Sequence, residues 1–219
     1  MEQLALFGDA VGRPPLPPPL LERDVLFYAL LLGPQLWHPA SRLVTGLRDK
    51  HGLTGRMRPT DTFHISVLGF GFADEIAPQD VELAISIAER TRFAPFELAF
   101  DRIESLARRR RKADAVPLLL AAGAGSQEIT ALAARLTNSM IGHGMRPRRL
   151  KPSPPNLALL DDVVRVPPTL LDPSLRIEVA GFSLIRAHAG AGRYTVLWSP
   201  DAPRPDDRPA VRSATPARA

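Results

Sequence analysis

Residues 63–71 carry the side chains of this chain that are best suited to phosphate chemistry. Their alternating pattern predicts a strand on which His64 and Ser66 share one face and the apolar Ile65 lies on the other. A serine hydroxyl can donate a hydrogen bond to a phosphate oxygen, and an imidazole can move a proton. The pair therefore predicts a phosphate site, with His64 as the catalytic residue and Ser66 as a phosphate ligand.

A second segment, residues 155–160, has the same predicted shape about 90 residues later. Asn156 and Ala158 stand there at the positions where a second histidine and a second hydroxyl would be wanted. An amide can hydrogen-bond a phosphate oxygen, but it cannot transfer a proton near neutral pH. We therefore expect Asn156 to bind phosphate without acting as an acid or base; the alternative is that it is an ordinary strand residue.

Three further residues are candidates for the rim of the same groove. His188 lies in a predicted hairpin loop over residues 187–192, and it could replace the missing proton donor if the loop reaches the groove. Arg186 and Tyr194 lie on the strands at either side of that loop. Pairing within the sheet is an equally good interpretation of these two residues.

The composition limits the class of protein. The chain has 219 residues, of which 45% are hydrophobic and 23% charged, as expected of a globular domain. It contains no cysteine, which excludes disulfides, thiolate metal ligands and a cysteine nucleophile. The N-terminus lacks a signal-peptide pattern, and the longest apolar run is far shorter than the roughly 20 residues that span a bilayer. We expect a cytoplasmic monomer that uses no metal, no cofactor and no membrane.

The net charge of +5 is unevenly spread. Basic residues gather in the unbroken run 108–112 and again over 146–151, just before the Asn156 segment. Such patches attract phosphate-rich partners such as RNA. The alternative is that the run is a solvated loop.

Apolar periodicity and breakers predict the elements that must position these residues. Prolines cluster over residues 14–19 and 203–216, so residues 1–22 and 201–219 are expected to be disordered tails around a folded part of residues 23–200. Strands are predicted over 25–32, 64–71, 96–103, 115–120 and 155–160, with helices opening at Pro34, Pro78 and Ser126. A closing hairpin is predicted from residues 176–186 and 194–198. The fold class is α+β, with two pseudo-duplicated antiparallel sheets, helices on their outer faces and a central groove.

This ordered set of motifs resembles the 2H phosphoesterases, and within them the bacterial RNA 2',3'-cyclic phosphodiesterases, historically named 2'-5' RNA ligases. The resemblance covers roughly residues 24 to 200. Residues 58–69 match the first motif with its Arg-Pro approach, Arg146 and Pro147 match the approach to the second, and residues 182–186 with Tyr194 match the closing hairpin.

The resemblance implies metal-free hydrolysis of 2',3'-cyclic phosphates at RNA ends or on nucleotides. One histidine of the family is the general base for water, the other is the general acid on the leaving ribose oxygen, and two hydroxyls hold the phosphate. Only His64 and Ser66 carry these roles over to this chain. We therefore expect a cyclic phosphodiesterase weakened at its second motif; the alternative is a catalytically inactive protein of the same fold that binds RNA ends or nucleotides.

Overall fold

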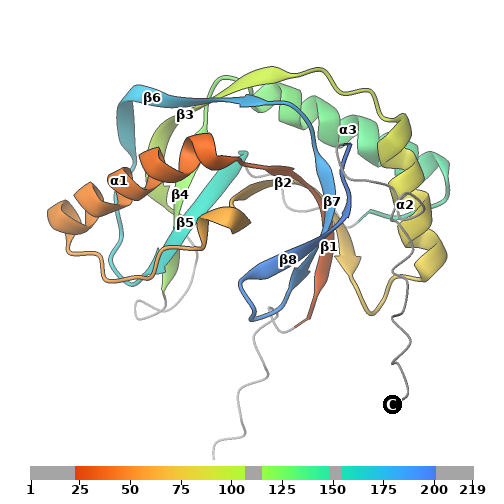
Figure 1. The fold of residues 1–219 in the computed structure, drawn as a ribbon, viewed down its shortest axis with the longest axis horizontal. Helices are drawn as coiled ribbons and strands as arrows, with labels where there is room; N and C mark the ends of the chain where they lie inside the picture. Colours follow the sequence, from red (N-terminus) through yellow and green to blue (C-terminus); the bar gives the residue numbers. More distant parts are fainter. Residues whose placement is uncertain (1–22, 107–114, 148–153, 201–219) are drawn as a thin grey trace, which may run out of the picture.

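Two four-stranded antiparallel sheets form the frame of the computed structural model, which describes residues 23–106, 115–147 and 154–200 (Figure 1). The first sheet, called sheet A, has the strand order β2 (His64–Phe72), β1 (Val25–Leu31), β7 (Ser183–His188) and β8 (Arg193–Trp198). The second, called sheet B, has the order β5 (Asn156–Asp162), β4 (Val116–Ala122), β3 (Phe96–Ser105) and β6 (Thr169–Val179).

Each sheet contains a strand–helix–strand unit that ends in an edge strand. In sheet A the unit is β1, α1 (Pro34–His51) and β2; in sheet B it is β4, α3 (Ser126–Gly142) and β5. Both edge strands pair antiparallel with the first strand of their own unit. The predicted α+β fold with pseudo-duplicated antiparallel sheets is therefore confirmed.

The helices tie the two sheets together. Proline opens α1 and α2 (Pro78–Arg90), where its missing N–H costs nothing. Helix α1 follows a strand of sheet A but contacts β6 of sheet B, whereas α3 follows a strand of sheet B but contacts β2 of sheet A. Helix α2 contacts both α3 and β7, and Figure 1 shows α2 and α3 together at one end of the molecule.

One continuous apolar core lies between the helices and the sheets. The stripe of α3 predicted from the sequence is fully buried, through Ile129, Leu132, Leu136 and Met140. A second, smaller apolar cluster lies on the opposite face of sheet A, because side chains alternate along a strand. It contains Phe27, Ala29 and Ile185, with Val25, Leu31, Ala187 and Tyr194 packed against them.

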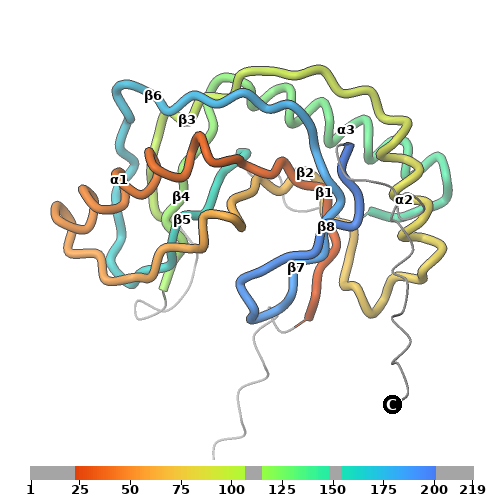
Figure 2. Tube along the Cα trace, viewed as in Figure 1, coloured from red at the N-terminus to blue at the C-terminus, as the bar shows by residue number. Residues whose placement is uncertain are grey.

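The predicted closing hairpin is wrong in one respect. Residues 176–186 do not form one strand: β6 ends at Val179 in sheet B, and β7 begins at Ser183 in sheet A. Figure 2 shows the chain crossing from one sheet to the other between them. Gly181 lies in this crossing, where a Cβ would stand 3.1 Å from the Pro200 ring. The hairpin consists of β7 and β8, and β6 pairs with β3.

Several sequence-based predictions fall on residues outside the described ranges. These are the two tails (1–22 and 201–219), the basic run 108–112, and the residues Arg148, Arg149 and Lys151. Within the described ranges, no helix is long and apolar enough to cross a membrane.

Candidate functional site

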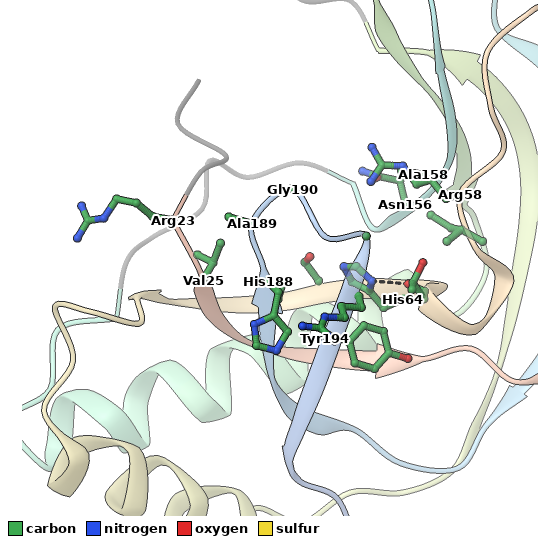
Figure 3. Close-up of a pocket in the computed structure, with 16 residues that line it drawn as sticks. Arg23, Val25, Arg58, His64, Asn156, Ala158, His188, Ala189, Gly190 and Tyr194 are labelled. Carbon is green, nitrogen blue, oxygen red and sulfur yellow. Dashed lines mark hydrogen bonds between the residues drawn. The ribbon is translucent and has the colours of Figure 1, made fainter. Parts of the chain in front are cut away.

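A cavity of about 390 Å³ lies where the edge strands of the two sheets approach each other. Strand β2 contributes His64 and Ser66 to its lining, and β5 contributes Asn156 and Ala158. The hairpin of β7 and β8 forms another wall, from Ala187 to Tyr194 (Figure 3). The structure thus brings both motif strands predicted from the sequence to one cavity.

The approach to β2 explains why the two motif strands meet. Met57 forms a β-bridge with Leu160, and the Arg58 N–H donates to the Leu159 carbonyl oxygen at 2.7 Å. The chain therefore runs alongside β5 before the short helix η1 (Thr60–Thr62) turns it into β2. His64 follows after Phe63, so this pairing holds the start of β2 close to β5.

The two motif positions have the same local geometry. His64 Nδ1 hydrogen-bonds the carbonyl oxygen of Thr62 at 2.8 Å, and Asn156 Nδ2 donates to the carbonyl oxygen of Pro154, also at 2.8 Å. Each side chain is thus tied to the backbone two residues before it. The strand pairing is also similar: His64 lies opposite Leu31, near the end of β1, and Asn156 lies opposite Ala121, near the end of β4.

The environment of His64 favours the neutral imidazole. A carbonyl oxygen can only accept, so Nδ1 carries the hydrogen towards Thr62 and the neutral ring keeps its lone pair on Nε2. Burial lowers the pKa of His64 below its usual value of 6.5; the Thr62 carbonyl opposes this shift and the positive charge of Arg58 adds to it. The ring packs near Phe27, with centroids 5.2 Å apart. His64 is therefore suited to accept a proton at Nε2.

Tyr194 forms the other side of the His64 pocket. Its ring meets the imidazole edge-on, with centroids 6.2 Å apart and an interplanar angle of 82°. Its hydroxyl donates to the carbonyl oxygen of Asp61 at 2.7 Å, which fixes the ring against the segment that leads into β2. Burial, with a contribution from the Asp61 carboxylate, raises the pKa of Tyr194.

The charged residues of the cavity are arginines. Arg23, Arg58 and Arg193 line it, and no aspartate or glutamate of the described ranges does. Arg23 is bonded outside the cavity to Asp74 at 2.6 Å and Glu75 at 2.8 Å. The cavity is therefore suited to an anion. The described ranges also contain no group of three or more His, Asp or Glu placed to hold a metal ion.

A buried carboxylate holds the segment that carries Arg58. Asp162 is only 4% exposed, and it accepts from the N–H groups of Thr54 at 2.7 Å, Gly55 at 2.6 Å and Val164 at 2.8 Å. Burial raises the pKa of the Asp162 carboxyl, but these N–H groups outweigh it and leave the pKa lowered. Gly55 is required here, because a Cβ would lie 2.2 Å from the Asp161 carbonyl oxygen.

His188 reaches the cavity wall but is held by neighbouring groups. Its Nδ1 hydrogen-bonds the Asp24 carboxylate at 3.0 Å, and its Nε2 lies 2.8 Å from the Thr195 hydroxyl. Asp24 also accepts from the Ala189 N–H, which with Arg186 lowers the pKa of Asp24 to about 2. These bonds tie the loop after β7 to the start of β1.

Arg186 lies outside the cavity, contrary to the expectation that it would line the groove. Its Nε donates to Asp24 Oδ2 at 2.7 Å. Successive side chains of a strand point to opposite faces, and Ala187 takes the cavity face. The alternative of pairing within the sheet describes Arg186 better.

Sequence reasoning did not single out the three arginines of the cavity as site residues. Arg58 had a signal, since it opens the Arg-Pro approach to the first motif. Arg193 adjoins the candidate Tyr194, whereas Arg23 carries no sequence signal. Its position depends on the pairing of β1 with both β2 and β7.

Of the comparisons with known proteins, the one with solved structures finds matches, and these indicate the fold. No family model and no curated protein matches the chain. Among solved structures, TT0787 of Thermus thermophilus is similar at 23% identity and a TM-score of 0.58, covering 80% of this chain and 96% of that one. E. coli LigT complexed with NADP+ gives 23% and 0.56, and E. coli LigT complexed with 3'-AMP gives 22% and 0.57; both comparisons cover 81% of this chain and 98% of LigT. The chain therefore has the fold of TT0787 and E. coli LigT, in agreement with the α+β architecture that its motifs predicted.

Proposed function

We propose that this protein binds the 2',3'-cyclic phosphate end of RNA, or a cyclic nucleotide, and hydrolyses it slowly with His64 as its one proton-transferring side chain. The observation that carries the proposal is that His64, Ser66 and arginines line one cavity, while the Nδ1 bond to Thr62 leaves the lone pair of the neutral imidazole on Nε2. LigT, which shares the fold, has been crystallised with 3'-AMP and with NADP+. These complexes support a phosphate-carrying nucleotide as the kind of ligand that this fold binds.

In the proposed step, His64 Nε2 takes a proton from a water molecule whose oxygen attacks phosphorus. The bond between phosphorus and one ribose oxygen breaks, and that oxygen leaves with the bonding electron pair. Ser66 Oγ donates a hydrogen bond to a phosphate oxygen that does not leave. The products are a phosphomonoester and, after one proton is taken up from solvent, a free ribose hydroxyl.

The β5 side explains why the reaction is expected to be slow. Asn156 cannot give the leaving oxygen a proton, and Ala158 offers no hydroxyl. Loss of one acid or base group lowers the reaction rate by a factor of about 10²–10⁴. The same two residues favour a second candidate function, in which the cavity binds the phosphate end and the reaction does not occur.

The test measures binding and turnover on the same purified protein. Titration calorimetry with a nucleoside 2',3'-cyclic phosphate should show binding that weakens as salt is raised. Chromatography should then show slow conversion to the phosphomonoester, absent in His64→Ala. Binding without conversion would support the second candidate; absence of both would contradict the proposal.

A further inference from the structure

Among the described residues, the β5 side of the cavity has no proton donor that could act as an acid, but it has a cation, Arg58. We propose that Arg58 is a catalytic residue that stabilises the departing ribose oxygen as an anion, at the position where a proton donor would act. This inference rests on the proposed hydrolysis, and it assigns stabilisation of the leaving ribose oxygen to the positive charge of Arg58.

The position of Arg58 is the first argument. Arg58 N donates to the Leu159 carbonyl oxygen at 2.7 Å, so its backbone lies against the motif strand β5. Figure 3 shows the Arg58 side chain with Asn156 and Ala158 on one side of the cavity and His64 across from them. Its positive charge also contributes to the lowered pKa of His64. The guanidinium therefore faces the same ligand space as the base, from the opposite side.

The side chain is also held in place before any ligand binds. Arg58 Nη2 donates to Asp161 Oδ2 at 2.7 Å, and Asp161 itself belongs to β5. The buried Asp162 fixes the chain just before Arg58 through Thr54 and Gly55. Asp161 takes one hydrogen bond of a group that carries five N–H donors. A charge that is already positioned needs little reorganisation when an anion forms beside it.

The chemistry of arginine distinguishes this role from that of a histidine. Guanidinium does not lose its proton in proteins, so Arg58 cannot act as a general acid. It can hydrogen-bond the ribose oxygen as the bond to phosphorus breaks and the oxygen takes the electron pair. The oxygen then receives its proton from solvent water, while His64 later returns the attacking water's proton to solvent. A single positioned donor of this kind contributes about 10²–10³ in rate.

The other basic residues of the cavity fit this role less well. Arg193 begins β8 and so belongs to the hairpin wall, not to the β5 side. Arg23 lies at the opposite end of the cavity in Figure 3, and Asp74 and Glu75 both bind it. The two ring nitrogens of His188 are engaged by Asp24 and Thr195. Arg58, by contrast, is joined to β5 through the hydrogen bond from its own backbone N–H to the Leu159 carbonyl oxygen.

A double-mutant cycle on a nucleoside 2',3'-cyclic phosphate tests the proposal. In the wild-type background, Arg58→Ala should lower kcat by about 10² or more, with a smaller change in KM. In the Asn156→His, Ala158→Thr background, the same substitution should cost less than about tenfold, because an imidazole can then protonate the leaving oxygen. Arg58→Lys, which keeps the charge, should retain part of the rate in the wild-type background.

Arg135→Ala is the matched control, because it removes one positive charge from the exposed surface of α3 and should leave kcat unchanged. Circular dichroism and thermal melting show whether each variant is folded. An equal cost of Arg58→Ala in both backgrounds, or a rise in KM alone, would overturn the role of Arg58 and leave the proposed function standing. Absence of turnover by the wild type and by the Asn156→His, Ala158→Thr variant, with the ligand bound, would overturn both.

Discussion

The two motif strands of the cavity share a backbone frame and differ in chemistry. Both are edge strands, both pair with the first strand of their unit, and both tie a side chain to the carbonyl oxygen two residues earlier. His64 and Ser66 can move a proton and bind phosphate, whereas Asn156 and Ala158 can do at most the second. The frame is therefore maintained by strand pairing and core packing, which do not require the catalytic side chains.

The largest effect that separates the two strands should come from His64→Ala. Removal of the one base lowers kcat on a nucleoside 2',3'-cyclic phosphate by about 10²–10⁴. Asn156→Ala, its counterpart on β5, should change kcat by less than about tenfold, because a hydrogen bond to phosphate that is made before and during the reaction affects KM and not kcat. Steady-state kinetics on the two variants measures the ratio, and equal losses would contradict the asymmetry.

Ser66→Ala should show an intermediate effect. A hydrogen bond to a charged group is worth about 1.5–3 kcal/mol, or roughly a 10–150-fold change in affinity for the bound phosphate. Calorimetry with inorganic phosphate measures it without any turnover. If Ser66→Ala and wild-type protein bind phosphate equally, the hydroxyl is not a ligand.

The pH dependence of kcat/KM should also distinguish one base from an acid–base pair. Because burial lowers the pKa of His64, its base form persists below pH 6.5 and the acidic limb should fall below that pH. The titratable and charged residues around its cavity are Arg23, Arg58, Arg193, His188 and Tyr194. The wild-type profile should stay level from pH 7 to about 9, whereas a variant with a second histidine should show a basic limb.

The lowered pKa of His64 also affects folding stability. Below about pH 6.5 the unfolded chain binds a proton at this histidine more readily than the folded chain does. Folding stability should therefore fall as pH drops from 6.5 through the lowered pKa of His64, and this part of the fall should be absent in His64→Ala. Urea unfolding at a series of pH values measures the difference between the two proteins.

The clearest expected effect on stability belongs to Asp162. Asp162→Ala leaves the N–H groups of Thr54, Gly55 and Val164 without their acceptor. The loss should be about 2–3 kcal/mol of unfolding free energy. Thermal unfolding compared with Asp49→Ala, a change on the exposed surface of α1, gives the measurement, and a loss equal to that of the control would contradict the described role.

Much of the fold follows from local pattern. The strand of His64, the strand of Asn156 and the apolar stripe of α3 were predictable because periodicity and proline or glycine breakers are local properties. The change of sheet between β6 and β7 was not predicted, because Gly181 marks a break in the run but a break does not specify which sheet the chain joins next.

The candidate site was predictable only in part, for the same reason. His64, Ser66 and Asn156 could be found as a repeated pattern along the chain. Arg58 enters the site because its segment pairs with β5, and Arg186 leaves it because Ala187 takes the cavity face. Both outcomes depend on contacts between residues far apart in sequence, which one sequence does not specify.

The central claim is that β5 has the backbone geometry of a motif strand, whereas Asn156 and Ala158 cannot transfer a proton. The most direct test is kcat on a nucleoside 2',3'-cyclic phosphate for the Asn156→His, Ala158→Thr variant beside the wild type. Because the frame is intact, the variant should turn over at least about tenfold faster, and His64→Ala should abolish the gain. A folded variant that gains nothing, or fast wild-type turnover that survives His64→Ala, would contradict the claim.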